Sequence, residues 1–405
     1  MAFTYQEREY QSRLVNSTTK FFTEIDPSIN RPNHSVMLLS PCGSGKTVVS
    51  MRIVEELYQH GFEKVVFIAH RHRLLNQALD YIDWMGLRDK LPNLNFKAVS
   101  IYEKNIYELK NADLVIFDEA HHSACDSGIR LVDKINPRRI LGLTATNWRS
   151  DRIKLVFEKL VEDYGINSLI EMGYLAKYDH YMIEKWDPVS VVNTYLRDQD
   201  VFGKSIMYFH TTEESEYAVS LLKAAGVAAE SIYGTSVDHV RENIYSRFES
   251  GETKVLCNLL LLTEGVDFPD LKTVFVKPSI KGLTIQMAGR ALRLAENKTF
   301  ANVVQMAGDG YSFSRVAGSR ESYVRRDGRW VHTTFSREFL NKLGASTLKY
   351  KLALSKDLKA MESLHFTVNE QHRVNLAFLD EHRSNAKAVP DLEELAALSE
   401  GDWDE

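Results

Sequence analysis

"VMLLSPCGSGKTVVSMRIVEELYQ" (36–59) is the stretch that decides the fold. A short apolar run of strand type enters a glycine-containing turn, and apolar residues at helical spacing follow the turn. The same alternation recurs through both halves of the chain, in "KVVFIAH" (64–70), "ADLVIFD" (112–118), "RILGLTA" (139–145), "SIMYFH" (205–210), "KVLCNLL" (254–260) and "TVFVKP" (273–278). Buried, β-branched strands that alternate with helices are typical of parallel sheets covered on both faces. We therefore predict an α/β protein with two such sheets.

The turn in this stretch has the chemistry of a phosphate-binding loop. Around Ser44, the glycines Gly43 and Gly45 let the backbone curl so that its N–H groups, with the helix N-terminus, surround phosphate oxygens. Lys46 would reach the β- and γ-phosphates of a nucleotide, and Thr47 would ligate Mg²⁺. The general pattern GxxxxGK[ST] begins with glycine, whereas this chain has serine at residue 40. The prediction therefore depends on the strand–loop–helix context.

Length and composition set the class of protein. The 405 residues, 44% of them hydrophobic, are enough for two cores, because single cores rarely grow past roughly 250 residues. The net charge of -5 gives no overall sign of nucleic-acid affinity, although a local basic groove remains compatible with it. The three cysteines Cys42, Cys125 and Cys257 show no CxxC spacing, which argues against a disulfide framework or a thiolate zinc site.

The cysteine usage favours a reducing compartment, so we expect a cytoplasmic protein. The first residues do not resemble a signal peptide, and no apolar run approaches the roughly 18 residues of a membrane-spanning helix. We therefore expect a soluble protein without a membrane partner.

Breaks in the pattern predict where the domains end. Gly173, Pro188 and a polar aromatic stretch interrupt the alternation, which predicts a first domain over 1–172 and a linker over 173–195. The second domain would occupy 196–310. A C-terminal extension would follow over 311–405, with an arginine-rich, aromatic segment and an acidic end.

Two carboxylates follow a buried strand in "LVIFDEAHH" (114–122). Ligands of open α/β sheets bind at the carboxyl ends of strands, so Asp118 and Glu119 would face the same phosphates as the loop. Asp118 would bind Mg²⁺, while Glu119 would orient and deprotonate the attacking water. A zinc site is disfavoured because the HExxH order is absent and Mg²⁺ prefers oxygen ligands. We expect His121 to sense the nucleotide or to hydrogen-bond to the second half of the chain, and we leave His122 unassigned.

Taken together, the motifs "GSGKT" (43–47), "DEAHH" (118–122), "TAT" (144–146) and "QMAGRALR" (286–293) resemble the superfamily-two helicases, the DEAH-like motors built from two RecA-like domains. The resemblance covers about residues 5–310 in the expected order. It is nearest to the DNA-directed branch of phage branch-migration helicases of the UvsW kind, XPB-like repair helicases and restriction-enzyme motors. Asn147 stands where relatives have proline, and "SIYEKN" (100–105) replaces a Gln-Thr pair that contacts DNA.

This resemblance implies roles for further residues. "REYQ" (8–11) is similar to the adenine-recognition element, so Gln11 would bond the base. "LLTEGVDFP" (261–269) is similar to the motif linking ATP and nucleic acid, which assigns Gly265 and Asp267 to the nucleotide. "GYLAKY" (173–178) would be the interdomain hinge. The residues assigned to nucleic acid are Arg71, Gln77, Thr144, Thr146, His210, Thr211, Thr212 and Thr263.

The arginines of "QMAGRALR" would complete the catalytic set. Arg290 and Arg293 lie three residues apart, on one face of a helix, and would act as arginine fingers on the transferring γ-phosphoryl group. Gln286 would touch the γ-phosphate or the water beside them. Charge spacing alone would make such a pair a solvated helix face. Because these residues come from the second domain, hydrolysis would require the two domains to close.

Two segments allow a purely structural interpretation. The His-Thr-Thr at 210–212 either contacts phosphates or caps a helix. "SRESYVRRDGRW" (319–330) is either a backbone clamp, in which Tyr323 or Trp330 stacks on a base, or a β-hairpin around the tight-turn pair Asp327-Gly328. The acidic end is a solubilising tail or a nucleic-acid mimic.

The sequence thus predicts a monomeric ATPase stimulated by nucleic acid, with ATP and Mg²⁺, that unwinds or branch-migrates single-stranded, forked or branched DNA in recombination, replication or repair. A phage origin would place it in the host cytoplasm. The alternatives are an RNA helicase, a double-strand DNA translocase serving a nuclease complex, and an ATP-gated DNA-binding switch.

Overall fold

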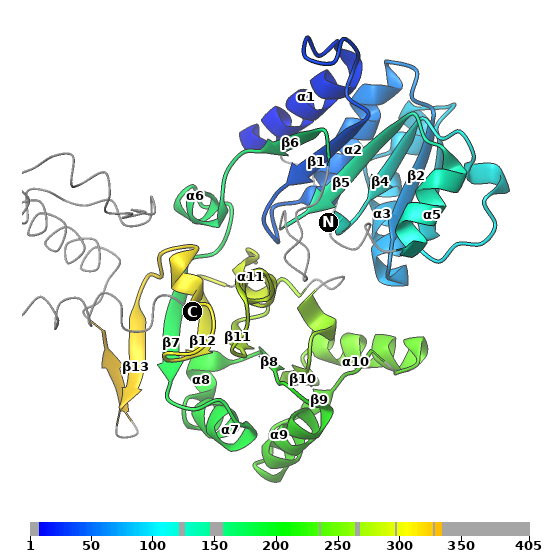
Figure 1. Ribbon diagram of the computed structural model, residues 1–405. Helices are drawn as coiled ribbons and strands as arrows, with labels where there is room; N and C mark the ends of the chain where they lie inside the picture. Colours follow the sequence, from blue (N-terminus) through cyan, green and yellow to red (C-terminus); the bar gives the residue numbers. More distant parts are fainter. Residues whose placement is uncertain are drawn as a thin grey trace, which may run out of the picture. The chain divides into compact units, whose positions relative to one another are not determined.

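The computed structural model describes residues 8–120, 126–145, 157–234, 236–263, 268–295, 298–326 and 329–333. Contacts divide the chain into two compact units, each built on its own sheet (Figure 1). The first unit comprises 1–175 together with 262–269 and 285–294; the remaining residues form the second. None of the described helices is long and apolar enough to cross a membrane.

Six strands form the first sheet, in the order β3-β2-β4-β5-β1-β6, and all of their pairings are parallel. They are β1 (Ser35–Leu39), β2 (Lys64–Ala69), β3 (Asn95–Ser100), β4 (Leu114–Phe117), β5 (Arg139–Thr144) and β6 (Lys159–Glu162). All four residues of β4 and the last five of β2 are buried, as expected for strands covered on both faces.

Helices connect the strands of the first unit. They are α1 (Glu9–Thr23), α2 (Lys46–Tyr58), α3 (His72–Trp84), α4 (Leu87–Lys90), η1 (Tyr107–Leu109), α5 (Asp126–Ile135) and α6 (Ile166–Glu171). Because the strands are parallel, the residues that follow β1, β2, β4 and β5 gather at one edge of the sheet, where open α/β sheets bind their ligands. The phosphate loop follows β1, and the carboxylate pair follows β4.

Eight strands form the second sheet, in the order β14-β13-β7-β12-β11-β8-β10-β9, with only the β13–β14 pair antiparallel. They are β7 (Tyr178–Ile183), β8 (Ser205–Tyr208), β9 (Ala229–Ser231), β10 (Val255–Asn258), β11 (Thr273–Val276), β12 (Ala301–Met306), β13 (Ser322–Arg326) and β14 (Arg329–His332). The helices in this part of the chain are α7 (Pro188–Arg197), α8 (Gln199–Phe202), α9 (Thr212–Ala224), α10 (Asp238–Ser250), η3 (Leu261–Thr263), α11 (Lys281–Gly289), η4 (Arg290–Leu292) and η5 (Phe313–Arg315). Of these, η4, residues 262–263 of η3 and residues 285–289 of α11 belong to the first unit. The predicted α/β class, with two sheets that are parallel apart from one edge pair, is confirmed.

The range 173–195 is structured, which corrects the expected linker. It contains β7, an interior strand that pairs with β12 and β13, and most of α7. The strand was not predicted because its sequence contains polar residues. Two of them, Asp179 and His180, are nevertheless almost fully buried. Asp179 is compensated by ion pairing with Arg320 at 2.5 Å, and His180 lies 3.1 Å from the side-chain oxygen of Gln305. The composition of this range thus predicted a domain boundary at residues that form part of the second sheet.

The segment 319–330 forms the predicted β-hairpin, whose strands flank the turn pair at 327–328. The ring of Tyr323 stacks on Tyr181 at 5.0 Å and 19°, and Trp330 meets the same ring at 4.9 Å and 72°. Trp330 also donates a 2.9 Å hydrogen bond to Asp198. These aromatic side chains pack on the second unit's core, so the proposed stacking of either ring on a base is not what the structure shows.

Candidate nucleotide site

The phosphate loop is shaped by its own backbone. Gly43 and Gly45 have φ of 78° and 87°, a left-handed conformation that glycine adopts without strain. Ser40 occupies the position at which the general pattern has glycine. Its N–H donates to the carbonyl of Thr144 at 3.0 Å, and its hydroxyl lies 2.6 Å from the hydroxyl of Ser44. The loop then enters α2 at Lys46, so its amides and the helix N-terminus are directed at the same space.

Helix α1 holds the loop from the other side. The Tyr10 hydroxyl donates to the Ser44 carbonyl at 2.6 Å, and the Gln11 amide donates to the same oxygen at 2.9 Å. A Cβ at Gly45 would lie 2.7 Å from the Gln11 nitrogen, so a larger residue would displace the Gln11 amide in addition to straining the backbone at this positive φ. Burial raises the pKa of the Tyr10 phenol, against the lowering effect of Arg8, so the phenol remains a donor. Gln11 is thus placed to support the loop, in addition to the base contact expected of it.

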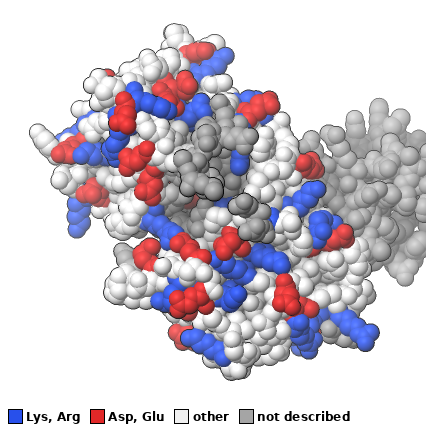
Figure 2. Space-filling model, turned by 180° about the vertical axis from the view of Figure 1, so that it is seen from behind, with Lys and Arg blue, Asp and Glu red and all other residues white. Residues whose placement is uncertain are grey.

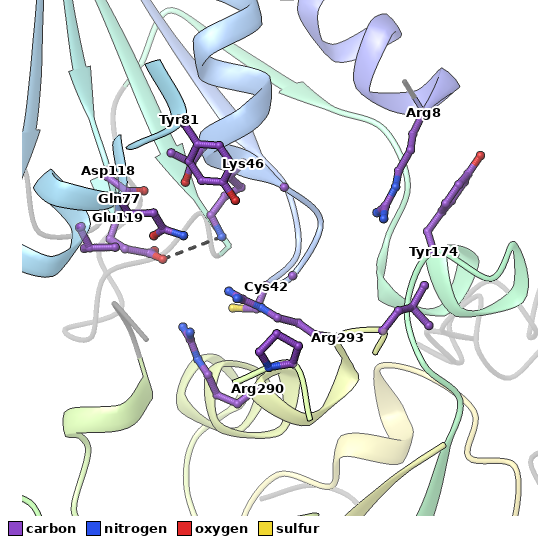
Figure 3. Close-up of a pocket in the computed structure, with 16 residues that line it drawn as sticks. Arg8, Cys42, Lys46, Gln77, Tyr81, Asp118, Glu119, Tyr174, Arg290 and Arg293 are labelled. Carbon is purple, nitrogen blue, oxygen red and sulfur yellow. Dashed lines mark hydrogen bonds and ion pairs between the residues drawn. The ribbon is translucent and has the colours of Figure 1, made fainter. Parts of the chain in front are cut away.

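Lys46 and Glu119 face each other within the first unit (Figure 3). The Lys46 nitrogen lies 3.9 Å from a carboxylate oxygen of Glu119, and both side chains are at least nine-tenths buried. Burial acts to lower the pKa of Lys46, but the negative charge of Glu119, with smaller contributions from Cys42 and Asp118, outweighs it and the pKa is raised. The ammonium group is therefore charged, as phosphate binding requires.

Glu119 has an unusual backbone conformation. Its φ is 52°, which non-glycine residues rarely adopt and which costs about 1–2 kcal/mol. Its N–H donates to the Asp118 carboxylate at 3.1 Å, and the N–H of Asp118 continues the sheet by bonding Ile68 at 2.9 Å. The chain turns sharply after β4, so that the two consecutive carboxylates both reach the pocket beside the loop.

One pocket of the first unit collects most of the predicted nucleotide-site residues. It is lined by Arg8, Cys42, Gly43, Gly45, Lys46, Thr47, Leu74, Gln77, Tyr81, Asp118, Glu119, Tyr174, Pro269, Arg290, Arg293 and Leu294. Four of these side chains are cationic and two are carboxylates, a balance that suits a polyphosphate. Figure 3 shows Arg290 and Arg293 reaching toward the space in front of Lys46. Gln286, although buried on α11, does not line the pocket.

The two arginines are positioned differently. Arg290 donates a short hydrogen bond to the carbonyl of Thr263, which fixes its guanidinium. The side chain of Arg293 lies close to the phosphate loop, 3.1 Å from where a Cβ on Gly43 would be. Burial lowers the pKa of Arg293, although an arginine remains protonated at neutral pH. Both cations are thus held where negative charge on a nucleotide would be stabilised.

The residues in the pocket fit Mg²⁺ as an oxygen-ligand site. The Thr47 hydroxyl and the Asp118 carboxylate both line the pocket, and Mg²⁺ prefers such hard oxygen ligands. Among the residues that the structure describes, no three His, Cys, Asp or Glu side chains come together as metal ligands. His121, Thr146, Gly265 and Asp267 lie outside the described residues, as does the acidic end.

Sequence reasoning missed the far end of the pocket. The Arg8 guanidinium lies over the ring of Tyr174 at 5.3 Å, and Tyr174 also contacts Tyr10 at 5.2 Å. Both Arg8 and Tyr174 lie in motifs that were quoted for other reasons, the adenine element and the hinge. An arginine and an aromatic residue in segments that belong to one site are the signal that could have identified them. Tyr81 and Leu74, on α3, carried no such signal.

Several residues expected to contact nucleic acid have other positions. Thr144 is fully buried at the end of an interior strand and Thr263 is 4% exposed, so neither side chain is available to a strand in this structure. Gln77 lines the nucleotide pocket. Arg71 is half-buried at the start of α3, with its Nε 3.0 Å from His70. The expectations for Thr144 and Thr263 are corrected.

The His-Thr-Thr segment caps α9. The Thr211 hydroxyl accepts the N–H of Glu214 at 3.2 Å, and the Glu214 carboxylate accepts the N–H of His210 at 2.9 Å. The first bond caps the helix, and the second closes the turn one residue before the N-cap. His210 is exposed and Thr212 is half-buried, so both remain available for other contacts. Charge gives no further guidance, because Lys and Arg are interspersed with Asp and Glu over the face shown in Figure 2.

Two family descriptions match the chain: "Type III restriction enzyme, res subunit" over residues 4–98 and 94–149, and "Helicase conserved C-terminal domain" over 188–295. A Lactococcus phage "51.5 kDa protein" is 27% identical over 65% of this chain and 64% of its own length. The "Putative ATP-dependent helicase IRC3" of Saccharomyces cerevisiae is 25% identical over 74% and 51%. The chain thus spans about half to two-thirds of the length of these relatives.

Two solved structures share the fold. S. cerevisiae Dbp5 bound to RNA and ADP BeF3 has a TM-score of 0.55 at 15% identity, over 75% of this chain and 84% of its own. The ATP-dependent Type ISP restriction-modification enzyme LlaBIII bound to DNA has a TM-score of 0.54 at 16% identity, over 87% of this chain and 31% of its own. The two parallel-sheet units resemble a RecA-like helicase core, as the sequence predicted.

Proposed function

We propose, from the two family matches that together indicate an ATP-hydrolysing superfamily-two helicase, that this protein is a DNA-dependent ATPase that moves along DNA and unwinds or branch-migrates it. The observation that carries the proposal is the pocket in which Lys46, Asp118, Glu119, Arg290 and Arg293 converge. Recombination, replication or repair of DNA is the proposed setting.

In the proposed reaction, the phosphate loop and Lys46 bind the β- and γ-phosphates of ATP. Glu119 accepts a proton from the attacking water, and its carboxylate lies 3.9 Å from the Lys46 nitrogen, at the phosphate end of the pocket. Arg290 and Arg293 stabilise the negative charge on the transferring γ-phosphoryl group. Mg²⁺ held by Thr47 and Asp118 would add charge neutralisation at the phosphates.

Arg8 and Tyr174 complete the site at the opposite end. A guanidinium over a tyrosine ring, 5.3 Å from its centroid, is a flat surface of the kind that contacts a purine. Gln11 and Tyr10 connect this end to the loop through their shared acceptor, the Ser44 carbonyl. We propose that α1 thereby reports the presence of the base to the phosphate loop.

DNA is proposed ahead of RNA for one reason. The restriction-enzyme description matches 4–149, which includes the phosphate loop and the carboxylate pair. The RNA-bound and DNA-bound structural neighbours share only the fold with this chain, so they do not separate the two nucleic acids. RNA-stimulated activity is therefore a defined outcome of the experiment below, and so is duplex translocation without strand separation.

The test is ATP hydrolysis measured without nucleic acid and with single-stranded DNA, duplex DNA, forked DNA and RNA of matched sequence. We expect stimulation by DNA, and strand displacement on the fork. Glu119→Gln should retain ATP binding and lower kcat by about 10²- to 10⁴-fold. Glu63→Gln, an exposed substitution of the same kind, is the control. Absence of stimulation by every nucleic acid would refute the motor, and substantial turnover by Glu119→Gln would refute the role of Glu119.

A further inference from the structure

The loop after β3 exposes two tyrosines. The side chains of Tyr107 and Tyr102 are 84% and 68% exposed, the highest values among the large hydrophobic residues of the described chain. They lie five residues apart in "SIYEKNIYELK" (100–110). Single exposed apolar residues are common, but two largely exposed tyrosines in one short loop are a feature that marks contact surfaces.

The loop is anchored so that both rings face solvent. Ile101 and Leu109 are 4% and 3% exposed, and they join one core cluster of the first unit, on which Ile106 also packs. Each tyrosine directly follows one of the two isoleucines. Because Ile101 and Ile106 turn inward, Tyr102 and Tyr107 are directed outward.

Hydrogen bonds within the loop keep this arrangement. The N–H of Tyr102 donates to the Ser100 hydroxyl at 3.3 Å, and the N–H of Tyr107 donates to the Asn105 side chain at 3.4 Å. Between them, one oxygen of Glu103 accepts the N–H groups of the next two residues at 2.8 and 2.7 Å. These bonds order the backbone of the loop, so little backbone freedom would be lost when the rings contact a partner, which favours binding.

The loop lies at the sheet edge that carries the other ligand-binding loops of the first unit. Strands β2 and β3 are parallel neighbours, Ala69 pairs with Ser100, and the N–H of Ile101 bonds the Ala69 carbonyl at 3.0 Å. His70 and Arg71 follow Ala69 directly. The loop that carries the two tyrosines therefore starts beside the segment that carries Arg71, the residue of this edge predicted to contact a phosphate backbone.

The two carboxylates near the rings are engaged by other groups of the protein, and a lysine between the rings is exposed. Glu108 forms an ion pair with Lys97 at 3.0 Å, and Glu103 is engaged by the loop backbone. Lys104 is exposed between the two tyrosines. A cation flanked by exposed rings is the combination by which proteins bind single strands, with the cation on the phosphates and the rings on the bases.

We propose that Tyr102 and Tyr107 form a stacking platform for unpaired bases and give the protein a preference for single-stranded over duplex nucleic acid. This inference rests on the proposed function, because it assumes that a nucleic-acid strand occupies this edge of the first unit. Bases in a duplex are already stacked on one another and would not reach the rings.

The test compares binding of the full chain to a fluorescein-labelled single strand of DNA, the same single strand of RNA, and a blunt duplex. Tyr102→Ala and Tyr107→Ala should each weaken single-strand binding by about 5- to 150-fold and leave duplex binding unchanged. Tyr102→Phe and Tyr107→Phe retain the ring and should bind as wild type. Tyr217→Ala, which removes an exposed tyrosine from α9, is the control and should have no effect.

The outcomes separate this inference from the function on which it rests. Equal single-strand binding by wild type and the two alanine variants would overturn the platform while leaving a nucleic-acid-dependent ATPase intact. Equal losses on single strand and duplex, or equal losses in the phenylalanine variants, would also overturn it. A wild-type chain that binds none of the three probes would refute the proposed function and the platform together.

Discussion

The hairpin of the second unit and the loop after β3 in the first unit place aromatic residues among charged ones, yet they use them in opposite ways. In the hairpin, Tyr323 and Trp330 pack against Tyr181 with centroids about 5 Å apart. In the loop, Tyr102 and Tyr107 are the most exposed large hydrophobic residues described. The hairpin, with its arginines, has the composition of a nucleic-acid clamp. Anchoring neighbours, and not local composition, therefore decide whether a ring is free to bind.

Removing a ring of the hairpin should strongly destabilise the protein, whereas removing a ring of the loop should not. Trp330→Ala should lower the free energy of unfolding by about 3 kcal/mol, because it removes a partly buried ring that packs on Tyr181 and Phe202 and exposes this part of the core to water. Urea unfolding followed by circular dichroism measures it. Tyr107→Ala, in the loop, should change the same quantity by no more than about 0.5 kcal/mol. If Trp330→Ala left the free energy of unfolding unchanged and weakened nucleic-acid binding instead, the packing role of this ring would be contradicted.

A pH effect should arise in the core beneath the hairpin. Burial lowers the pKa of His180 to about 4, and its bond to Gln305 only partly offsets that. The unfolded state, with an ordinary pKa near 6.5, binds a proton that the folded state rejects between these pH values. The free energy of unfolding should therefore fall as pH drops from about 6.5 toward 4, by at most about 1.4 kcal/mol per pH unit.

Urea unfolding of wild type and His180→Gln at pH 7, 6 and 5 measures this dependence, since glutamine cannot titrate. His60→Gln removes an exposed histidine and is the control. The wild-type slope should be reduced in His180→Gln and kept in His60→Gln. Identical slopes in all three proteins would show that His180 is not neutral in the folded state.

The smallest predicted effect concerns Thr211, where the choice between structural and binding roles recurs for a polar side chain. Thr211→Val should lower the free energy of unfolding by about 1 kcal/mol, because it removes the cap on the Glu214 N–H. Thr211→Ser should preserve stability. If Thr211→Val is as stable as wild type but binds DNA more weakly, the hydroxyl serves the strand and the capping interpretation fails.

Features that depend on a short stretch of chain could be predicted from the sequence. The phosphate loop, the carboxylate pair and seven strands follow from local patterns, and parallel pairing then places the loop and the carboxylates at one edge. Contacts between distant segments could not be predicted. Neither the bonds of Tyr10 and Gln11 to Ser44 nor the insertion of β7 between β12 and β13 has a local pattern. Strand β7 was not predicted because it contains buried polar residues, whose partners lie more than 120 positions away in the sequence.

The position of β7 also has a consequence for biosynthesis. It is the first strand of the second sheet to leave the ribosome, but its neighbours β12 and β13 are among the last strands made. At roughly 5–20 residues per second, about 120 residues of translation separate β7 from β12, which amounts to roughly 6–24 s. During that interval its backbone donors and acceptors have no strand to pair with. Chaperone demand should therefore be greatest for nascent chains arrested between residues 183 and 301.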